Sequence, residues 1–335
     1  MTRKRAFSGI QPTGSAHLGN YLGAIRNWVR TQDELESFYC IVDLHSMTLP
    51  WDPSTLRRET VAKGAELLAA GIDPAKSVLF IQSHVPAHSE LAWVLMCVAR
   101  MGELRRMVQF KEKSKGETES VGAGLFTYPV LQAADVLLYQ ADGVPVGEDQ
   151  RQHIELMRDL AGRFNGMFGR TFTPPEPWIP EEGVRVMSLD DPTQKMSKSE
   201  SDTRPNSVIG MVDDPGVILK KVRAAVTDSG RDIVATPEKP ALTNLLTIFS
   251  LVSGEPVPAI EERFAGSGYG DFKSALADAV VDGLEPIRTR YLELMADPAE
   301  TDRILAGGAE KAAEEAEKTM TVVHERVGLV PRAPA

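Results

Sequence analysis

Two polar segments of the chain combine residue types that bind phosphate. His17, Gly19 and Asn20 lie in a turn that follows a short apolar run (residues 6–10) and precedes an amphipathic one. A turn that leads into a helix presents unpaired N–H groups and the positive end of the helix dipole to an anion. The second segment, residues 195–199, reads Lys-Met-Ser-Lys-Ser and is suited to folding over a polyphosphate. We interpret the two segments as opposite sides of one nucleotide site, in an enzyme that activates a substrate with ATP.

Carboxylates occur at two further places that need an explanation. Asp135 lies in an otherwise apolar helical run (residues 129–139), where a carboxylate is costly to bury without a partner. It is therefore either on a solvent-facing side of the helix or a group that binds something. Glu148 and Asp149 come before an expected helix at residues 150–164, and acidic residues there are also suited to capping that helix.

These features together resemble a known family. Residues 17–20 and 195–199 look like the HIGH-type element and the KMSKS loop of class I aminoacyl-tRNA synthetases, with Asn20 in place of the usual second histidine. Three more segments, residues 8–14, 128–135 and 146–150, narrow the match. With them the chain is similar, from about residue 7 to residue 328, to the bacterial tryptophanyl-tRNA synthetases. Five motifs in the right order make chance a poor explanation.

The resemblance implies an activity and a set of residues. Tryptophan attacks the α-phosphate of ATP, pyrophosphate leaves, and the tryptophanyl group then passes to the 3′ end of tRNA(Trp). Such chemistry needs alignment and charge stabilisation rather than a covalent nucleophile. The implied catalytic residues are His17, Asn20, Lys195, Lys198 and Lys111, and Lys113 lies in the same segment as Lys111 with a plain surface position as its alternative. The implied ATP-binding residues are Gln11, Pro12, Thr13, Gly19, Asn20, Gly147, Glu148, Asp149, Val186, Lys195, Met196, Ser197, Lys198 and Ser199.

The resemblance also implies a tryptophan pocket. In the family, the aspartate that matches Asp135 accepts the indole N–H. Phe7, Tyr128 and Gln132 map near the same pocket, and Gln132 departs from the methionine expected there. His45 and Gln150 are further candidates for substrate contacts. ATP is expected as a substrate with its accompanying Mg²⁺, and no dedicated protein metal site is expected because the sequence has no Cys/His cluster.

The elements that position these residues can be read from the pattern of apolar residues. Residues 37–42, 77–82 and 184–189 are short apolar runs typical of buried strands, and a helix is expected between the first two, opened by Asp52 and Pro53 and closed by Gly71. Such alternation predicts an α/β fold with a doubly wound parallel sheet and ligands at the strand carboxyl ends. We therefore expect a Rossmann-like catalytic domain at residues 1–205, with a helical insertion near 85–140. A helical anticodon-recognition domain at residues 206–335 is expected to follow, with its last helix packing back on the first domain.

The composition of the chain bears on its cellular compartment and on its binding partners. The net charge of −10 excludes a general nucleic-acid binder, but the six basic residues in residues 100–115 permit either a local tRNA footprint or a solvated helix face. Cys40 and Cys97 are predicted to be reduced core thiols of a cytoplasmic protein, since both have apolar neighbours. No signal peptide or membrane span is expected. A homodimer is expected from the family and from the apolar residues in residues 91–107.

Three alternative functions make different demands on the sequence. A tyrosyl enzyme would favour a Lys-Phe-Gly-Lys-Ser loop and a basic C-terminal module, whereas this chain ends in a Glu-rich segment. A non-catalytic paralogue would be expected to have lost Gly19 or the loop lysines, which are all present. A small-molecule adenylyltransferase would not need the large helical second half.

Overall fold

The centre of the structure is a parallel sheet. The computed structural model describes residues 3–107, 122–179, 185–197 and 204–330. Within these residues the sheet has five strands in the order β3-β2-β1-β4-β5, all parallel. The strands are β1 (Arg5–Ile10), β2 (Glu36–Ile41), β3 (Val78–Ile81), β4 (Gly143–Pro145) and β5 (Glu176–Trp178). The predicted α/β fold with a doubly wound parallel sheet is therefore confirmed.

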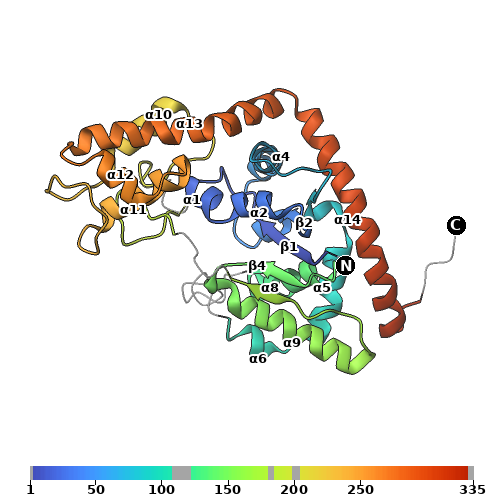
Figure 1. Cartoon of the computed structure of the whole chain (residues 1–335). Helices are drawn as coiled ribbons and strands as arrows, with labels where there is room; N and C mark the ends of the chain where they lie inside the picture. Colours follow the sequence, from blue (N-terminus) through green and yellow to red (C-terminus); the bar gives the residue numbers. More distant parts are fainter. Residues whose placement is uncertain (1–2, 108–121, 180–184, 198–203, 331–335) are drawn as a thin grey trace.

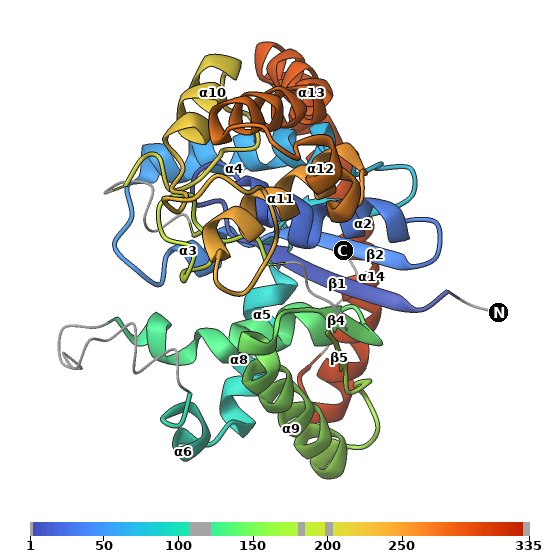
Figure 2. The ribbon, with the colours of Figure 1, turned by 60° about the vertical axis from the view of Figure 1, so that its left-hand side comes forward.

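The strands alternate their side chains between two apolar cores, as the two-residue period of a strand requires. Tyr39 and Ile41 of β2 belong to one cluster of buried residues, and Phe38 and Cys40 belong to the other. Figure 2 separates the two layers, with α2, α4 and α10–α13 on one side of the sheet and α5, α8 and α9 on the other. Both faces of the sheet are thus covered, which explains why its strands have few polar positions.

The helices of the first half follow the strands closely. They are α1 (Leu18–Asn20), η1 (Tyr21–Ile25), α2 (Arg26–Thr31), α3 (Asp43–Ser46), α4 (Pro53–Ala69), η2 (Gln82–His84), α5 (Ala87–Val98), α6 (Met101–Leu104), α8 (Ala123–Leu137), η3 (Glu148–Gln150) and α9 (Arg151–Phe168). The predicted limits of α4 are confirmed, because Asp52 Oδ2 accepts from the Thr55 N–H and Gly71 ends the helix with a φ of 106°.

The second half is helical. It contains α10 (Pro215–Ala224), α11 (Pro240–Ser253), α12 (Val257–Arg263), α13 (Tyr269–Ala296) and α14 (Pro298–Val327). The helical character expected for residues 206–335 is therefore found in their described part. Helices α10–α13 gather at one end of the molecule, and α14 returns along the opposite side (Figure 1). The proposed division of the chain at residues 205 and 206 stays a prediction, since one apolar cluster runs from Tyr39 of the sheet to Phe249 of α11.

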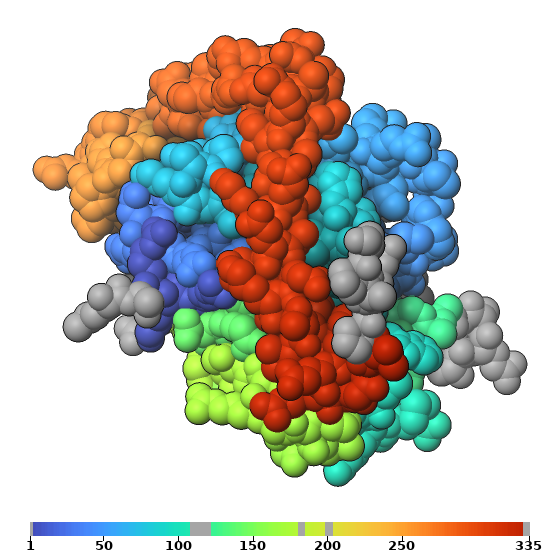
Figure 3. Space-filling model, turned by 90° about the vertical axis from the view of Figure 1, so that its right-hand side faces the viewer, coloured from blue at the N-terminus to red at the C-terminus, as the bar shows by residue number. Residues whose placement is uncertain are grey.

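Helix α14 runs as a strap across the first half of the chain (Figure 3). It packs on β3, the edge strand of the sheet, and thereby covers the side of that strand that has no neighbouring strand. The approach is close, because a Cβ on Gly308 would lie 1.8 Å from the carbonyl oxygen of Leu79. An ion pair between Arg5 and Glu315, 3.0 Å apart, joins the same helix to β1.

Two expectations from the sequence were wrong. The apolar run at residues 184–189 forms no strand of the sheet within its described part; Met187 instead makes an isolated antiparallel bridge with Lys195. Residues 186–187 pair with residues 195–196, which follow them in the chain, and not with a strand of the sheet. Cys40 is buried as expected, but Cys97 is exposed on the outer side of α5, because only part of that apolar helix faces the core. No helix in the described part of the chain is long and apolar enough to cross a membrane.

Candidate active site

A cavity of about 610 Å³ opens at the carboxyl ends of β1, β2 and β4. This is the place where a doubly wound sheet binds its ligands. Of the predicted site residues, the cavity brings together Phe7, Gln11, His45, Tyr128, Gln132, Asp135, Gly147, Asp149, Gln150 and Lys195. Residues from five separate parts of the sequence thus share one cavity, with the predicted tryptophan residues and predicted ATP residues both represented.

Asp135 of α8 is at the closed end of this cavity and is 1% exposed. Its Oδ2 lies 2.8 Å from His45 Nε2, and its Oδ1 lies 2.7 Å from Gln82 Nε2 and 2.6 Å from His88 Nδ1. Burial acts to raise the pKa of the Asp135 carboxyl, but the charge of His45 and the hydrogen bonds that His45 and His88 donate outweigh it and hold the pKa well below its usual range. Asp135 is therefore an ionised, buried acceptor and does not lie on a solvent-facing side of the helix.

The neighbouring predicted residues form the walls beside Asp135. The Tyr128 hydroxyl lies 2.9 Å from Nε2 of the buried His153, and burial raises the pKa of Tyr128 to about 12. Gln132 Nε2 donates to Gln150 Oε1 at 3.4 Å, which joins α8 to the segment after β4. Phe7 supplies an apolar ring from β1. The pocket therefore has flat aromatic walls and one charged acceptor at its end.

The first polar segment forms a closely bonded turn. His17 and Asn20 cap each other: the Asn20 N–H donates to His17 Nδ1 and the His17 N–H donates to Asn20 Oδ1, both at 3.2 Å. A helical run follows through α1, η1 and α2, and the π-helical turn η1 within it is a feature frequent at functional sites. His17 is buried and Asn20 is exposed. Both lie outside the lining of the cavity, as do Pro12, Thr13 and Gly19.

The two polar segments meet, as the sequence predicted. A Cβ on Gly19 would lie 3.5 Å from Met196 Cβ, in van der Waals contact with the second segment, and 3.0 Å from His17 Nδ1, where the histidine ring would have to shift. Main-chain bonds tie the surroundings together. The Leu18 N–H donates to Ile209 O at 2.8 Å, and the Met211 N–H donates to Ala16 O at 2.7 Å. Residues 209–211, which follow the segment at 195–199, are therefore paired with the turn that contains His17.

Two carboxylates of α4 hold the same turn from the other side. The Ala16 N–H donates to Glu66, with Oε2 at 3.1 Å, and the Gly14 N–H donates to Glu59 Oε2 at 2.6 Å. Glu66 also pairs with Lys63 at 2.5 Å, and both of these side chains are buried. The sequence reasoning missed this contact, because nothing in a helical pattern shows which loop its acidic residues will face.

The two acidic residues that follow β4, Glu148 and Asp149, have different surroundings. Glu148 makes a two-point ion pair with Arg151, with Nε at 2.5 Å and Nη2 at 2.9 Å from its two oxygens. This hydrogen bonding lowers the pKa of the exposed Glu148. Asp149 lines the cavity and accepts from Gln150 Nε2 at 2.9 Å. Within the described residues, Asp149 is thus the better placed of the two to meet a ligand.

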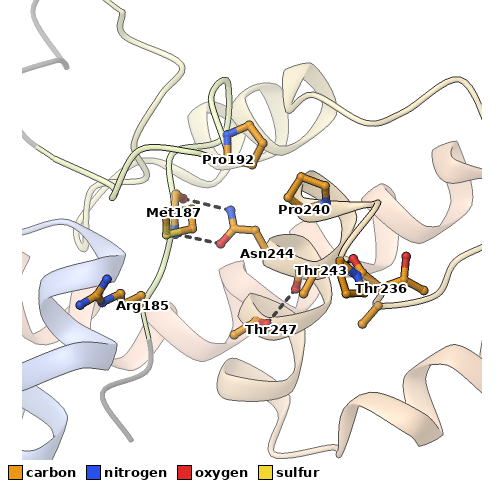
Figure 4. Close-up of a pocket in the computed structure, with 10 residues that line it drawn as sticks. Arg185, Met187, Pro192, Thr236, Pro240, Thr243, Asn244 and Thr247 are labelled. Atoms are coloured by element: carbon orange, nitrogen blue, oxygen red, sulfur yellow. Dashed lines mark hydrogen bonds between the residues drawn. The ribbon is translucent and has the colours of Figure 1, made fainter.

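Lys195 is exposed and lines the cavity from the side opposite α8. Its segment is held by short bonds: the Met196 N–H donates to Val186 O at 3.0 Å. Asn244 of α11 fixes the same segment, because its side chain both accepts from the Met187 N–H at 2.9 Å and donates to Met187 O at 3.0 Å. Figure 4 shows this pairing beside a smaller pocket between residues 185–192 and α11. The helical half therefore supports the lysine segment directly.

Several predicted residues remain without a structural test. Lys111, Lys113, Lys198 and Ser199 lie outside the described residues. Four further predicted residues do not line the cavity, although they are close in sequence to residues that were assigned to the same site: Glu148, Val186, Met196 and Ser197. In the described part of the chain, no group of three or more His, Cys, Asp or Glu side chains is arranged to hold a metal ion.

The sequence reasoning also missed Gln82 and His88, which contact Asp135 from η2 and α5. One signal was available for Gln82, which follows a predicted strand at the edge of the sheet where ligands bind. No comparable signal exists for His88, since a histidine on an apolar helix is usual in a protein core.

Comparison with known proteins agrees with this geometry. The family described as tRNA synthetases class I (W and Y) matches residues 2–285. The chain is 52% identical to the tryptophan–tRNA ligase of Wolinella succinogenes, over 98% of this chain and 100% of that protein. It is 54% identical to the tryptophan–tRNA ligase of Listeria monocytogenes, over 98% of each.

A solved structure gives the same result. The crystal structure of tryptophanyl-tRNA synthetase from Campylobacter jejuni, complexed with ADP and tryptophan, superposes with a TM-score of 0.86 at 36% identity, covering 97% of this chain and 100% of that one. These identities decide against a tyrosyl enzyme and a small adenylyltransferase, and the retained Gly19 and Lys195 argue against a non-catalytic paralogue. The chain therefore belongs to the class I tRNA synthetases, in the family of bacterial tryptophan–tRNA ligases.

Proposed function

We propose how the residues of the cavity divide the work of joining tryptophan to tRNA(Trp) with ATP, the activity of this family. The observation that carries the proposal is the contrast within one cavity between a buried carboxylate, Asp135, and an exposed cation, Lys195. The first suits an indole N–H, and the second suits a phosphate. The amino acid and the nucleotide then bind end to end, with the reacting carboxylate and α-phosphate between them.

The tryptophan side chain enters the closed end of the cavity. Its indole N–H donates to Asp135, and its ring lies between the aromatic walls of Phe7 and Tyr128. Gln132 and Gln150, which are already bonded to one another, face the polar end of the amino acid, and His45 holds Asp135 from the side. The carboxylate of tryptophan is then directed toward the nucleotide, where it attacks the α-phosphate and pyrophosphate leaves.

ATP occupies the other end. The side chains of His17 and Asn20, together with Gln11, Pro12 and Thr13 at the start of the turn, bind its phosphates, and Gly147 and Asp149 accept from the ribose hydroxyls. Val186 and Met196 provide the surface for the base. Lys195 stabilises the charge that moves onto pyrophosphate, with Lys198 and Lys111 as further candidates for that role. Mg²⁺ enters as part of the ATP substrate.

Two copies of the chain are proposed to act together. Trp93 on α5 is 67% exposed and Met101 on α6 is 59% exposed, and Cys97 lies between them in sequence and is also exposed. Large exposed apolar side chains that gather on one face are typical of an interface. Sedimentation at micromolar concentration should give a dimer, and Trp93→Glu should give a monomer. Met167→Glu on α9 is the matched control, because Met167 is 60% exposed on a different helix and should leave the dimer intact.

The tRNA partner and the compartment follow from the family. Arg100, Arg105 and Arg106 are exposed and are candidates for phosphate contacts, with a solvated surface as their alternative. We place the enzyme in the bacterial cytoplasm, where an exposed thiol such as Cys97 stays reduced.

The function is tested with the purified full-length chain. ATP–pyrophosphate exchange should depend on tryptophan and not on tyrosine, phenylalanine or the other amino acids. Addition of tRNA(Trp) should then give tryptophanyl-tRNA. Exchange that depends on tyrosine would overturn the amino-acid assignment, and absence of exchange with every amino acid would overturn the activity.

A further inference from the structure

Asp135, at the end of the cavity, is hydrogen-bonded to His88, and His88 is hydrogen-bonded to Tyr139. Neither His88 nor Tyr139 lines the cavity. We propose that His88, backed by Tyr139, is a positioning residue that presents one oxygen of Asp135 to the indole N–H and so sets the preference for tryptophan. This inference rests on the proposed role of Asp135 as the indole acceptor.

The hydrogen bonds of Asp135 leave one of its two oxygens available. Each carboxylate oxygen has about two acceptor positions. Oδ1 already accepts from Gln82 Nε2 at 2.7 Å and from His88 Nδ1 at 2.6 Å. Oδ2 accepts from His45 Nε2 at 2.8 Å and keeps its second position. The ligand's N–H group therefore meets Oδ2, provided that the carboxylate stays in this orientation.

His88 is placed to keep that orientation. It is 0% exposed, its Nδ1 faces Asp135 Oδ1, and its Nε2 lies 2.8 Å from the Tyr139 hydroxyl. An ionised carboxylate only accepts, so His88 Nδ1 carries the hydrogen of that bond. Nε2 is then the acceptor for the Tyr139 hydroxyl, which keeps its proton because burial raises the pKa of Tyr139. The tyrosine thus selects the ring form that donates to Asp135.

Tyr139 is itself held by packing. Its ring stacks on Phe38, with centroids 4.6 Å apart, and on Phe7, with centroids 5.7 Å apart. Tyr139, His88 and Gln82 all lie outside the lining of the cavity, whereas Asp135 and Phe7 line it. A chain of contacts thus runs from the aromatic core through His88 to Oδ1 of Asp135, and the other oxygen, Oδ2, is left to meet the ligand. His88 acts through Asp135, since it touches nothing that binds in the cavity.

The geometry of His88 allows a matched pair of variants. An asparagine amide nitrogen can occupy the place of His88 Nδ1, so His88→Asn keeps a donor for Asp135 and loses the contact with Tyr139. A glutamine amide reaches instead to the place of Nε2, so His88→Gln keeps the contact with Tyr139 and loses the donor. Both variants put an amide into the same buried site, and they differ in which neighbour it serves.

The readout must respond to the indole N–H and to nothing else. ATP–pyrophosphate exchange is measured with tryptophan and with benzothienylalanine, in which sulfur replaces the N–H group of the ring. We expect His88→Gln to reduce the ratio of kcat/KM for tryptophan over the analogue by about tenfold or more, with the value for the analogue nearly unchanged. His88→Asn should keep the ratio within about threefold of the parent. An equal loss for both substrates would show a merely structural role and would overturn the proposal.

Two further variants make every outcome decisive. Tyr139→Phe removes only a hydroxyl and should lower the ratio by about threefold; should neither His88 variant fold, an unchanged ratio in Tyr139→Phe would overturn the proposal. Asp135→Asn tests the proposed function separately. A ratio that stays high in Asp135→Asn removes Asp135 as the indole acceptor. A ratio that collapses in Asp135→Asn and persists in His88→Gln removes only the role of His88.

Discussion

The two ends of the cavity are built in different ways. At the closed end, Asp135 is 1% exposed and accepts from His45, Gln82 and His88, which come from three separate elements. At the open end, Lys195 and Asp149 are exposed, and the order of the phosphate-binding turn comes from main-chain bonds and from α4. The closed end is therefore preorganised, so that the proposed recognition of tryptophan there would require little rearrangement. At the open end the turn at residues 14–20 is held by these bonds, whereas we expect the exposed segment that carries Lys195 to be ordered by its ligands.

The largest effect at the closed end is expected when the carboxylate of Asp135 is removed. Asp135→Ala loses a hydrogen bond to a charged group, worth about 3 kcal/mol at most, and leaves three buried donors without an acceptor. We expect kcat/KM for tryptophan to fall by somewhat more than a hundredfold and the preference over phenylalanine and tyrosine to narrow.

Asp135→Asn is the control for size. It preserves the volume of the side chain but offers a weaker acceptor, so its loss should be smaller than that of Asp135→Ala and still measurable in ATP–pyrophosphate exchange. Parent-like activity in both variants would mean that the tryptophan pocket lies elsewhere.

At the open end, Lys195→Ala should affect the rate more than the binding of tryptophan. The lysine matters most when charge develops on pyrophosphate, and an interaction made mainly in the transition state appears in kcat. We expect a loss of about 3 kcal/mol, or roughly a hundredfold in kcat, with the dissociation constant of tryptophan unchanged. An unchanged kcat with a raised KM for ATP would instead assign Lys195 to ground-state binding.

The difference between the two ends also explains what the sequence could predict. The sheet, the limits of α4 and the meeting of residues 17–20 with residues 195–197 followed from apolar periodicity, capping residues and the family resemblance. These features depend on local pattern or on motifs that recur in order. Asp135 could be singled out because a carboxylate in an apolar helix needs a partner.

The partners themselves could not be predicted. His88 donates to Asp135 across 47 residues of sequence, and Glu66 meets Ala16 across 50. Such contacts depend on how elements pack in three dimensions, and the residues concerned look like ordinary core or surface positions in their own helices. The strand expected at residues 184–189 failed for a related reason, because the apolar residues there pack against the helical half rather than within the sheet.

The contact between Glu66 of α4 and the turn at Ala16 can be weakened by a substitution that does not touch Asp135 or its partners. Glu66→Gln leaves the charge of Lys63 buried without its partner, since Lys63 is 3% exposed and pairs with Glu66 at 2.5 Å. We expect the free energy of unfolding to fall by about 3–5 kcal/mol in urea titrations, and KM for ATP to rise about tenfold with KM for tryptophan unchanged. The double variant Lys63→Met/Glu66→Gln removes the unpaired charge and should recover most of the stability.

Glu59→Gln is the milder comparison at the same turn. Glu59 is only half-buried and holds the Gly14 N–H without a buried cation beside it, so its stability loss should be smaller. Equal increases in KM for ATP and for tryptophan in Glu66→Gln would contradict the separation of the two ends.

The smallest expected effect is a change in the amide exchange of residues 185–197 when ligands bind. If the open end is ordered by its substrate, amide hydrogen exchange in residues 185–197 should slow severalfold when ATP is bound together with tryptophanamide, which lacks the reacting carboxylate. The relevant amides include Met196, which donates to Val186 O. Amides of α8 around Asp135 should change little, because they lie within a helix whose side chains there are buried. ATP alone and tryptophanamide alone are the controls, and each should give less protection of residues 185–197 than the pair, since closure over both ligands brings the lysine segment to the phosphates. Equal protection of both ends by the pair of ligands would mean that the closed end is also ordered by its substrate, and the contrast drawn between the two ends would be lost.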